Sequence, residues 1–455
     1  MNQRIIAASL LALSLPLAAQ AAGEAKNVIF FLGDGMGPAT VTAARIYKYG
    51  EAGALNMEQL ARTARIKTFS NDAQTTDSAP SMSAYMTGVK MNNEVISMSS
   101  DTKAIAPTLP AGTGNCGSNN GSAVTTMLEL AKARGKAVGS ITTTRITHAT
   151  PAATYAHVCH RDAESDIAAQ AVPGGAGFNA ALKDGVDVLM GGGSKFFTPT
   201  TAGGVRVDGR NLIDEMKAKG YSYASTGTEL KAVDARSVSK LFALFHKDHM
   251  DYELDRVKKN LDQPSLAEMT VKAIDVLSKN SNGYFLMVEG GRIDHALHGT
   301  NAKRVMEDTI AFDEAIKAAL AKVDLNNTLL VFTADHDHTM AINGYSKRGN
   351  PILDISRNYK DGKEARDADG NTYTTLVFGN GPNRKDTRTS IVSGNTDSSM
   401  ALHDDYLQET AVRLASETHG GGDVMLGASG AGARSFKGSM DNTKVFTLLK
   451  SAFGF

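Results

Sequence analysis

The run Asp335-His336-Asp337-His338 holds the side chains of this chain with the most evident chemistry. It follows the apolar residues 329–332, which are typical of a buried strand in a parallel sheet. In an open α/β sheet, ligands bind beyond the carboxyl ends of the strands. An aspartate beside a histidine offers one oxygen and one nitrogen ligand, a combination that suits Zn²⁺. Taken alone, the run is equally compatible with a solvated turn.

A second carboxylate follows another predicted strand, residues 28–32. Asp34 lies between Gly33 and Gly35, and these glycines leave room for a ligand to approach the carboxylate closely. A plain Asp-Gly turn explains the segment equally well. The glycine spacing does not match the G-x-G-x-x-G fingerprint of dinucleotide-binding proteins.

Metal-ligand residue types recur after a third predicted strand, residues 284–288. Glu289 stands at the end of this strand, and Asp294 and His298 are four residues apart, so one helical turn would place both on the same face. His419 lies in a glycine-rich segment and is, by itself, more typical of a loop histidine than of a ligand.

Ser78 is a candidate nucleophile. Pro80 belongs in the first turn of a helix and Gly88 ends it, which places Ser78 near the helix N-terminus. The free N–H groups and the positive dipole end there favour an anion such as phosphate. A serine that only caps the helix is the plainer interpretation. No Gly-x-Ser-x-Gly elbow surrounds Ser78, which argues against a Ser-His-Asp hydrolase.

These side chains need a sheet whose strands end at one edge. Strand patterns occur at residues 28–32, 138–142, 186–190, 284–288, 328–333 and 376–378. Helical patterns occur at residues 124–134, 166–183, 212–219, 265–278 and 302–323. This alternation predicts an α/β fold of three layers, with helices on both faces of a mostly parallel central sheet. Residues 341–417 are dominated by Gly, Asn, Asp, Arg and Thr, and predict an insertion or small subdomain.

The composition excludes some partners. The chain has 455 residues, and its 48 basic side chains balance 48 acidic ones. We therefore expect no nucleic-acid partner. The length suits one large α/β domain with insertions, or two domains.

Residues 1–21 have the pattern of a signal peptide. Arg4 is followed by an apolar stretch at residues 5–19 and by the cleavage site Ala19-Gln20-Ala21. We expect a periplasmic or secreted protein without a membrane anchor, because no cysteine follows the cleavage site. In an oxidising compartment the two cysteines, Cys116 and Cys159, would form one disulfide or remain two buried thiols.

Six motifs occur in one order along the chain, and together they resemble those of the alkaline phosphatase family. They are Asp34-Gly35-Met36-Gly37, Thr76-Asp77-Ser78-Ala79, Thr150-Pro151-Ala152 with Arg161, Glu289-Gly290-Gly291-Arg292-Ile293-Asp294-His295-Ala296-Leu297-His298, Thr333-Ala334-Asp335-His336 and Thr418-His419-Gly420. Each motif is weak alone, but six in order are specific. The resemblance implies one catalytic domain over residues 22–455.

The resemblance also implies roles for the residues. Ser78 would be the nucleophile that becomes phosphoserine, and Arg161 would bind the substrate phosphate. The implied metal ligands are Asp294, His298 and His419 for one Zn²⁺; Asp34, Asp335, His336 and Ser78 for a second Zn²⁺; and Asp34, Thr150 and Glu289 for Mg²⁺. Asp77, His148, His295 and His338 would lie beside these groups and support them. His148 would either ligate the third metal or contact a water bound to it, and plain packing is the alternative for His148 and His295. Asp337 matches no ligand position and is expected to face solvent.

Two positions depart from the best-studied bacterial branch of that family. His148 and His295 replace an aspartate and a lysine, as in animal-type members. Imidazoles nearby could favour Zn²⁺ or Co²⁺ over Mg²⁺ at the third site. The insertion at residues 341–417 resembles the crown of animal members, which lies at a homodimer interface, so a homodimer is expected.

The sequence thus predicts a hydrolase of small phosphate monoesters. A phosphodiesterase or sulfatase of the same superfamily is one alternative, although a sulfatase needs a Cys- or Ser-x-Pro-x-Arg motif that is absent around Ser78. A non-catalytic periplasmic phosphate-binding protein is the other. It would not need six or more metal ligands beside a nucleophile.

Overall fold

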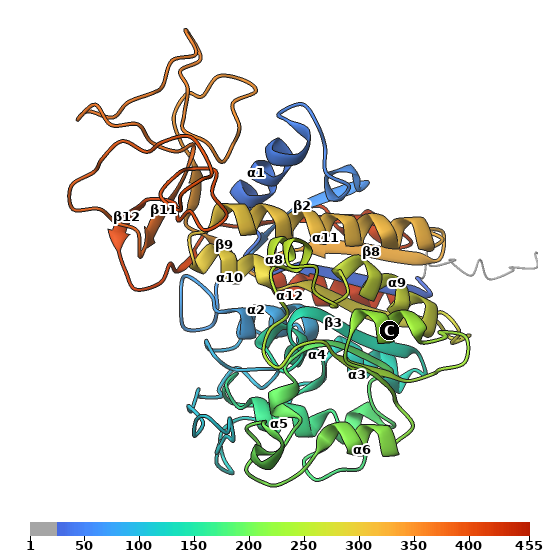
Figure 1. The fold of residues 1–455 in the computed structure, drawn as a ribbon. Coiled ribbons are helices and arrows are strands. Elements are labelled where there is room, and N and C mark those ends of the chain that lie inside the picture. The colour runs from blue at the N-terminus through green and yellow to red at the C-terminus, as the bar shows by residue number, and fades with distance from the viewer. Residues whose placement is uncertain (1–24) are drawn as a thin grey trace, which may run out of the picture.

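The computed structural model describes residues 25–455, so the predicted signal peptide lies outside the described residues. A ten-stranded sheet forms the centre of the molecule (Figure 1). In spatial order its strands are β15 (Gly438–Asp441), β2 (Arg62–Lys67), β14 (Val424–Gly430), β8 (Thr328–Thr333), β1 (Asn27–Gly33), β7 (Tyr284–Gly290), β3 (Ala137–Arg145), β4 (Val188–Gly192), β6 (Leu241–Leu244) and β5 (Ser222–Ala224). Only β14 runs against the other strands of this sheet.

Helices cover both faces of the sheet, which confirms the predicted three-layer α/β fold. On one face, α11 (Ala302–Lys322) packs with α1 (Pro38–Tyr49), α8 (Glu253–Lys258), α9 (Leu266–Leu277) and α10 (Arg292–His298). The other face carries α2 (Ser78–Thr87), α3 (Met127–Ala133), α4 (Ala149–Tyr155) and α12 (Asn442–Phe453). The shorter helices α5 (Glu164–Gln170), α6 (Leu212–Ala218) and α7 (Gly227–Ala232) belong to the part of the chain around β4, β5 and β6.

The strands at the centre are largely apolar because the helices bury both of their faces. Every residue of β7 and β8 is buried, and so is all of β1 after Asn27. Such strands read as continuous apolar runs, which is why the sequence predicted them closely.

One expected helix is wrong. The sequence pattern predicted a helix over residues 166–183, but α5 ends at Gln170. Pro173 and the glycines after it stop the helix, and Gly174 adopts a φ of 68°. The remainder of the segment is a loop with a single short turn of 3₁₀ helix.

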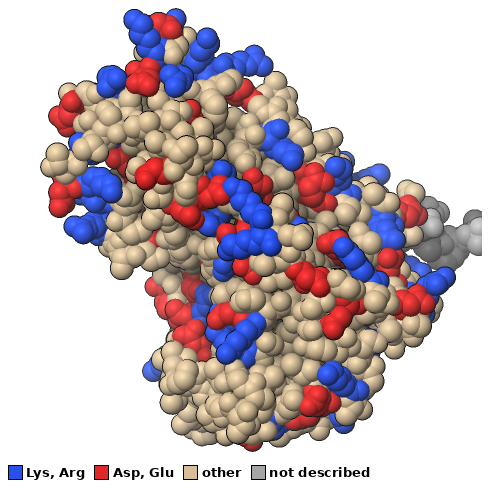
Figure 2. Space-filling model, in the orientation of Figure 1, with Lys and Arg blue, Asp and Glu red and all other residues tan. Residues whose placement is uncertain are grey.

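A smaller sheet lies at one end of the molecule, within and beside residues 341–417 (Figure 1). Its strands are β10 (Met340–Ile342), β11 (Leu376–Gly381) and β12 (Thr410–Arg413). A two-stranded pair, β9 (Asp337–His338) with β13 (His419–Gly420), connects this region to the end of β8. Charged side chains of both signs are interspersed on the face drawn in Figure 2.

Candidate metal centre and nucleophile

The carboxyl ends of β8, β1 and β7 bring three distant carboxylates together. These strands are neighbours, with Gly33 paired to Gly290 and Leu32 paired to Thr333. The three strands therefore stop at the same edge of the sheet. Glu289 lies at the end of β7, and Asp34 and Asp335 follow β1 and β8. The parallel register, rather than sequence proximity, assembles the group.

Site A consists of Asp294, His298 and His419. The Nδ1 of His298 lies 2.6 Å from the Glu417 carbonyl, and that of His419 lies 2.8 Å from the Thr76 carbonyl. Both Nδ1 atoms therefore carry the proton, and both Nε2 atoms carry a lone pair.

These two Nε2 atoms face each other at 3.2 Å. Asp294 Oδ1 lies 3.3 Å from the Nε2 of His298 and 3.5 Å from that of His419. Three acceptors thus converge on one point, which suits a cation with nitrogen and oxygen ligands. Without a metal a proton must take this place, and Asp294 raises the pKa of His298 although burial opposes the shift.

Site B consists of Asp34, Asp335 and His336, and it surrounds the Ser78 hydroxyl. His336 Nδ1 lies 3.2 Å from the Asp337 carbonyl, so the His336 Nε2 has the lone pair. That Nε2 lies 3.2 Å from Ser78 Oγ, 3.3 Å from Asp34 Oδ1 and 3.4 Å from Asp335 Oδ2. Burial raises the pKa of Asp335 to about 7, with a further increase from Asp34.

Site C consists of Asp34, Thr150 and Glu289. Asp34 Oδ2, Thr150 Oγ1 and Glu289 Oε1 are buried and find no hydrogen-bond partner within residues 25–455. An unpartnered buried polar atom is costly, so these three oxygens fit a cation as their common partner. Burial raises the pKa of Glu289 to about 7. An all-oxygen set of this kind suits Mg²⁺.

His338 lies behind site A. Its Nε2 is 2.8 Å from Asp294 Oδ1, and its Nδ1 is 2.6 Å from Glu417 Oε2. Glu417 also accepts the Thr339 N–H at 2.8 Å. None of the six motifs includes Glu417, although it stands two residues before His419. Buried carboxylates of this kind orient metal-binding side chains.

Arg161 lies beside site B on a loop that follows Cys159. Its guanidinium donates to Asp77 Oδ1, and its Nη2 lies 2.9 Å from the Nε2 of His148. The Asp77 carboxylate raises the pKa of Arg161 against the opposing effect of burial, so Arg161 stays charged. Cys159 is disulfide-bonded to Cys116, which confirms the first of the two predicted alternatives for the cysteines.

A third group of imidazoles, the outer histidine cluster, consists of His148, His249 and His295. The ring centroids of His249 and His295 are 4.3 Å apart, and those of His148 and His249 are 5.3 Å apart. Each ring has an arginine as a donor: Arg161 to His148, Arg145 to His249, and Arg292 to His295. His249 belongs to none of the six motifs, and no sequence signal placed it beside the other two.

The expectation for Asp337 is wrong. A Cβ at Gly37 would lie 1.6 Å from Asp337 Oδ1, and one at Gly422 would lie 2.4 Å from Asp337 Oδ2. The carboxylate is therefore enclosed between two glycine-containing segments instead of facing solvent. Its Oδ1 accepts the His338 N–H at 2.8 Å, which shapes the turn after β8.

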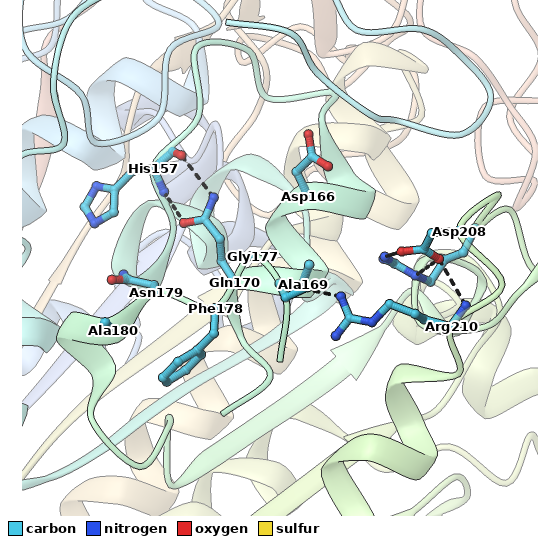
Figure 3. Close-up of a pocket in the computed structure, with 12 residues that line it drawn as sticks. His157, Asp166, Ala169, Gln170, Gly177, Phe178, Asn179, Ala180, Asp208 and Arg210 are labelled. Carbon is cyan, nitrogen blue, oxygen red and sulfur yellow. Dashed lines mark hydrogen bonds and ion pairs between the residues drawn. The ribbon is translucent and has the colours of Figure 1, made fainter. Parts of the chain in front are cut away.

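A cavity of about 520 Å³ lies elsewhere, between α5 and the loop that follows it (Figure 3). None of the residues of sites A, B and C lines it. Its arginines are already paired, Arg206 with Asp208 and Arg210 with Glu215. His157 in its wall contacts Glu129 at 2.8 Å. Asp166, a further acidic residue of its wall, accepts the Gly114 N–H at 2.7 Å, so the cavity presents no unpaired arginine to a phosphate group.

Comparison with known proteins agrees with this geometry. The model of the family described as alkaline phosphatase matches residues 25–455. The chain belongs to the alkaline phosphatase family. It is 38% identical to the human tissue-nonspecific isozyme of alkaline phosphatase over 438 residues, covering 89% of this chain and 79% of the human protein. It is also 38% identical to the alkaline phosphatase of Gadus morhua, covering 90% and 87% of the two chains.

Solved structures of alkaline phosphatases share the fold. The Thermus thermophilus enzyme superposes with a TM-score of 0.69 at 26% identity, covering 98% of this chain and 96% of that one. The enzyme from the Antarctic bacterium TAB5 gives a TM-score of 0.67 at 23% identity, covering 95% and 99%. This chain is thus an enzyme of the alkaline phosphatase class. No helix among the described residues is long and apolar enough to cross a membrane.

Proposed function

We propose that the chain hydrolyses phosphate monoesters through a covalent phosphoserine at Ser78 and releases inorganic phosphate. One observation carries the proposal: lone pairs without matching protons converge in sites A, B and C, around a buried serine hydroxyl. A binding protein for phosphate would need donors such as Arg161, but it would not need the acceptor side chains of sites A, B and C.

Zn²⁺ would occupy sites A and B, because both mix imidazole nitrogen with carboxylate oxygen. Mg²⁺ would occupy site C, with Zn²⁺ or Co²⁺ as the alternative. When bound, these ions would stabilise the negative charge that develops on the attacking and leaving oxygens of an in-line displacement. A variant of the TAB5 enzyme with a histidine replaced by glutamate has been solved with Mg bound in the M3 site, which supports a magnesium site in this family.

Ser78 is held for attack. It is the first residue of α2, where the N–H groups of the first turn and the helix dipole favour a phosphoryl group. Its hydroxyl has two acceptors within reach, His336 Nε2 at 3.2 Å and Asp34 Oδ1 at 3.4 Å. Loss of its proton would give the alkoxide that forms the phosphorus–oxygen bond.

Arg161 would bind two nonbridging oxygens of the phosphate with its planar guanidinium. Asp77 fixes one side of that group, and His148 accepts from the other. Because His148 uses its Nε2 as an acceptor, its buried Nδ1 carries the proton. His148 is then a donor beside site C and does not ligate the metal there. His295, with Nδ1 accepting from Arg292, would be neutral in the same way.

The wider assignments are part of this proposal. Residues 1–21 would direct export to the periplasm or the medium, and the disulfide fits an oxidising compartment. Residues 341–417 would form a crown-like insertion within a catalytic domain of residues 22–455. This insertion would contribute to a homodimer.

Turnover of three p-nitrophenyl compounds tests the proposal: the phosphate monoester, the bis-ester and the sulfate. The monoester should be hydrolysed fastest by orders of magnitude. Ser78→Ala and chelator treatment should each abolish that turnover, and labelled phosphate should be trapped on the wild-type chain but not on Ser78→Ala. Unchanged monoester turnover in Ser78→Ala would refute the proposal, and preference for the bis-ester would favour a phosphodiesterase.

A further inference from the structure

Glu94 occupies a turn position that normally belongs to glycine or asparagine. The Val95 N–H donates to the Asn92 carbonyl at 3.2 Å, and Glu94, the third residue of this turn, has a φ of 71°. Positive φ at this position is the mark of glycine in type II turns. A glutamate there carries a conformational cost, and such costs concentrate at functional sites.

The backbone of this turn contacts both members of the Asp77–Arg161 pair. The Glu94 N–H donates to Asp77 Oδ2 at 2.9 Å, and the Arg161 N–H donates to the Glu94 carbonyl at 2.7 Å. Asn93 Oδ1 accepts the Asp77 N–H at 3.1 Å. The backbone of Glu94 is therefore hydrogen-bonded to the residue whose guanidinium is proposed to bind the phosphate.

The Glu94 carboxylate adds a negative charge that Arg161 does not neutralise. Glu94 is half-buried and has no hydrogen bond or ion pair from its side chain to any described residue. Arg161 is already paired with Asp77, and the nearby Asp162 is also acidic. Burial raises the pKa of Glu94 to about 7, so the carboxylate is ionised under alkaline conditions.

We propose that Glu94 determines specificity for the alcohol part of the substrate, favouring monoesters whose alcohol carries a positive charge and disfavouring those whose alcohol carries a negative charge. This inference rests on the proposed function, because it needs the phosphate at Arg161 and Ser78. The hydrogen bonds of the Glu94 backbone to Asp77 and Arg161 keep its carboxylate near the bound phosphate, where its charge would act on the alcohol. In a partly solvated site, a single charge near the phosphate-binding group changes the ratio of the rates for a cationic and an anionic substrate by about tenfold.

Three small monoesters with alcohols of different charge test the proposal: phosphocholine, glycerol 1-phosphate and phosphoglycolate. The measured quantity is the ratio of kcat/KM for phosphocholine to that for phosphoglycolate, at pH 9 and low salt. Glu94→Gln should lower this ratio about tenfold relative to the wild type, and added salt should lower the wild-type ratio in the same direction. Glu364→Gln, on the insertion far along the chain, is the matched control and should leave the ratio unchanged.

Glu94→Gly guards against a folding defect, because glycine accepts the positive φ. It should lose the same selectivity and keep at least the wild-type Tm. An unchanged ratio in both active variants would overturn the role of Glu94 alone. Failure of the wild type to hydrolyse any of the three monoesters would instead overturn the proposed function, and this inference with it.

Discussion

Site A and the outer histidine cluster contain the same kind of side chain but differ in where the protons lie. In site A the Nε2 atoms of His298 and His419 point at each other and at Asp294, and no arginine of the described residues donates to any of the three. In the outer histidine cluster each ring accepts from an arginine. Proximity alone would mark both groups as metal sites. The arginine donors separate them: they supply protons to the rings of the outer histidine cluster, whereas the facing nitrogens of site A require a cation.

The largest expected effect comes from removing a ligand of site A, which tests whether site A binds a metal. His419→Ala should lower kcat/KM for p-nitrophenyl phosphate on the order of a thousandfold, since the metal would lose one of three protein ligands. The same variant should bind one zinc fewer, measured by elemental analysis. Retention of full zinc content and activity would show that His419 is a loop histidine, as its sequence context alone suggested.

The second, smaller effect concerns the residue behind site A. His338→Gln should lower kcat/KM about 10- to 100-fold, because Asp294 and Glu417 would lose their common partner. Zinc affinity, measured by competition with a chelator, should fall by a similar factor. If activity fell while zinc affinity stayed constant, His338 would act on the substrate and not on the metal ligand.

The third test addresses the outer histidine cluster. His249→Phe keeps the ring packing but removes the acceptor for Arg145, which remains paired with Glu164 and Asp248. We expect unchanged metal content, less than about a threefold change in kcat/KM, and a loss of roughly 1 kcal/mol in the free energy of unfolding. Loss of a bound metal in this variant would mean that the cluster is itself a metal site.

The smallest effect concerns Asp308, which lies near Arg292. Burial raises the pKa of Asp308 to about 8, well above the 3.8 of an unfolded chain. The folded state thus keeps a proton that the unfolded state has lost between these values, so this group makes stability fall as pH rises from about 4 to 8. Asp308→Asn should remove this slope and raise the unfolding free energy at pH 8 by about 1–3 kcal/mol. Urea unfolding at pH 6 and pH 8 measures it, and parallel pH slopes for variant and wild type would contradict the shifted pKa.

The sequence predicts the centre of this molecule better than its edges. β1, β7 and β8 are largely apolar, and acidic residues stand at or just after their carboxyl ends, so both the strands and their chemistry can be located from the sequence. β2, β14 and β15 were not predicted. Most residues of β2 are exposed, so it lacks an apolar run, and β14 is antiparallel to its neighbours. The helix expected at residues 166–183 is wrong because the apolar periodicity continues past Pro173 and the glycines after it, which do not allow a helix there.

The sequence predicts which residue types make up the candidate site. It does not predict which nitrogen of each histidine carries the proton. Asp34, Glu289 and Asp335 were identified from strand ends, and the register of parallel strands explains why that reasoning holds. His249, Glu417 and Glu94 could not be found, because each depends on a contact between distant loops. Glu94 in particular is recognisable only from its φ and from its hydrogen bonds to Asp77 and Arg161.

Anomalous diffraction from zinc in crystals of the metal-replete protein tests the central claim most directly. The account predicts one peak among Asp294, His298 and His419, a second among Asp34, Asp335 and His336, and none within the outer histidine cluster. A peak between His148, His249 and His295, with site A empty, would contradict it.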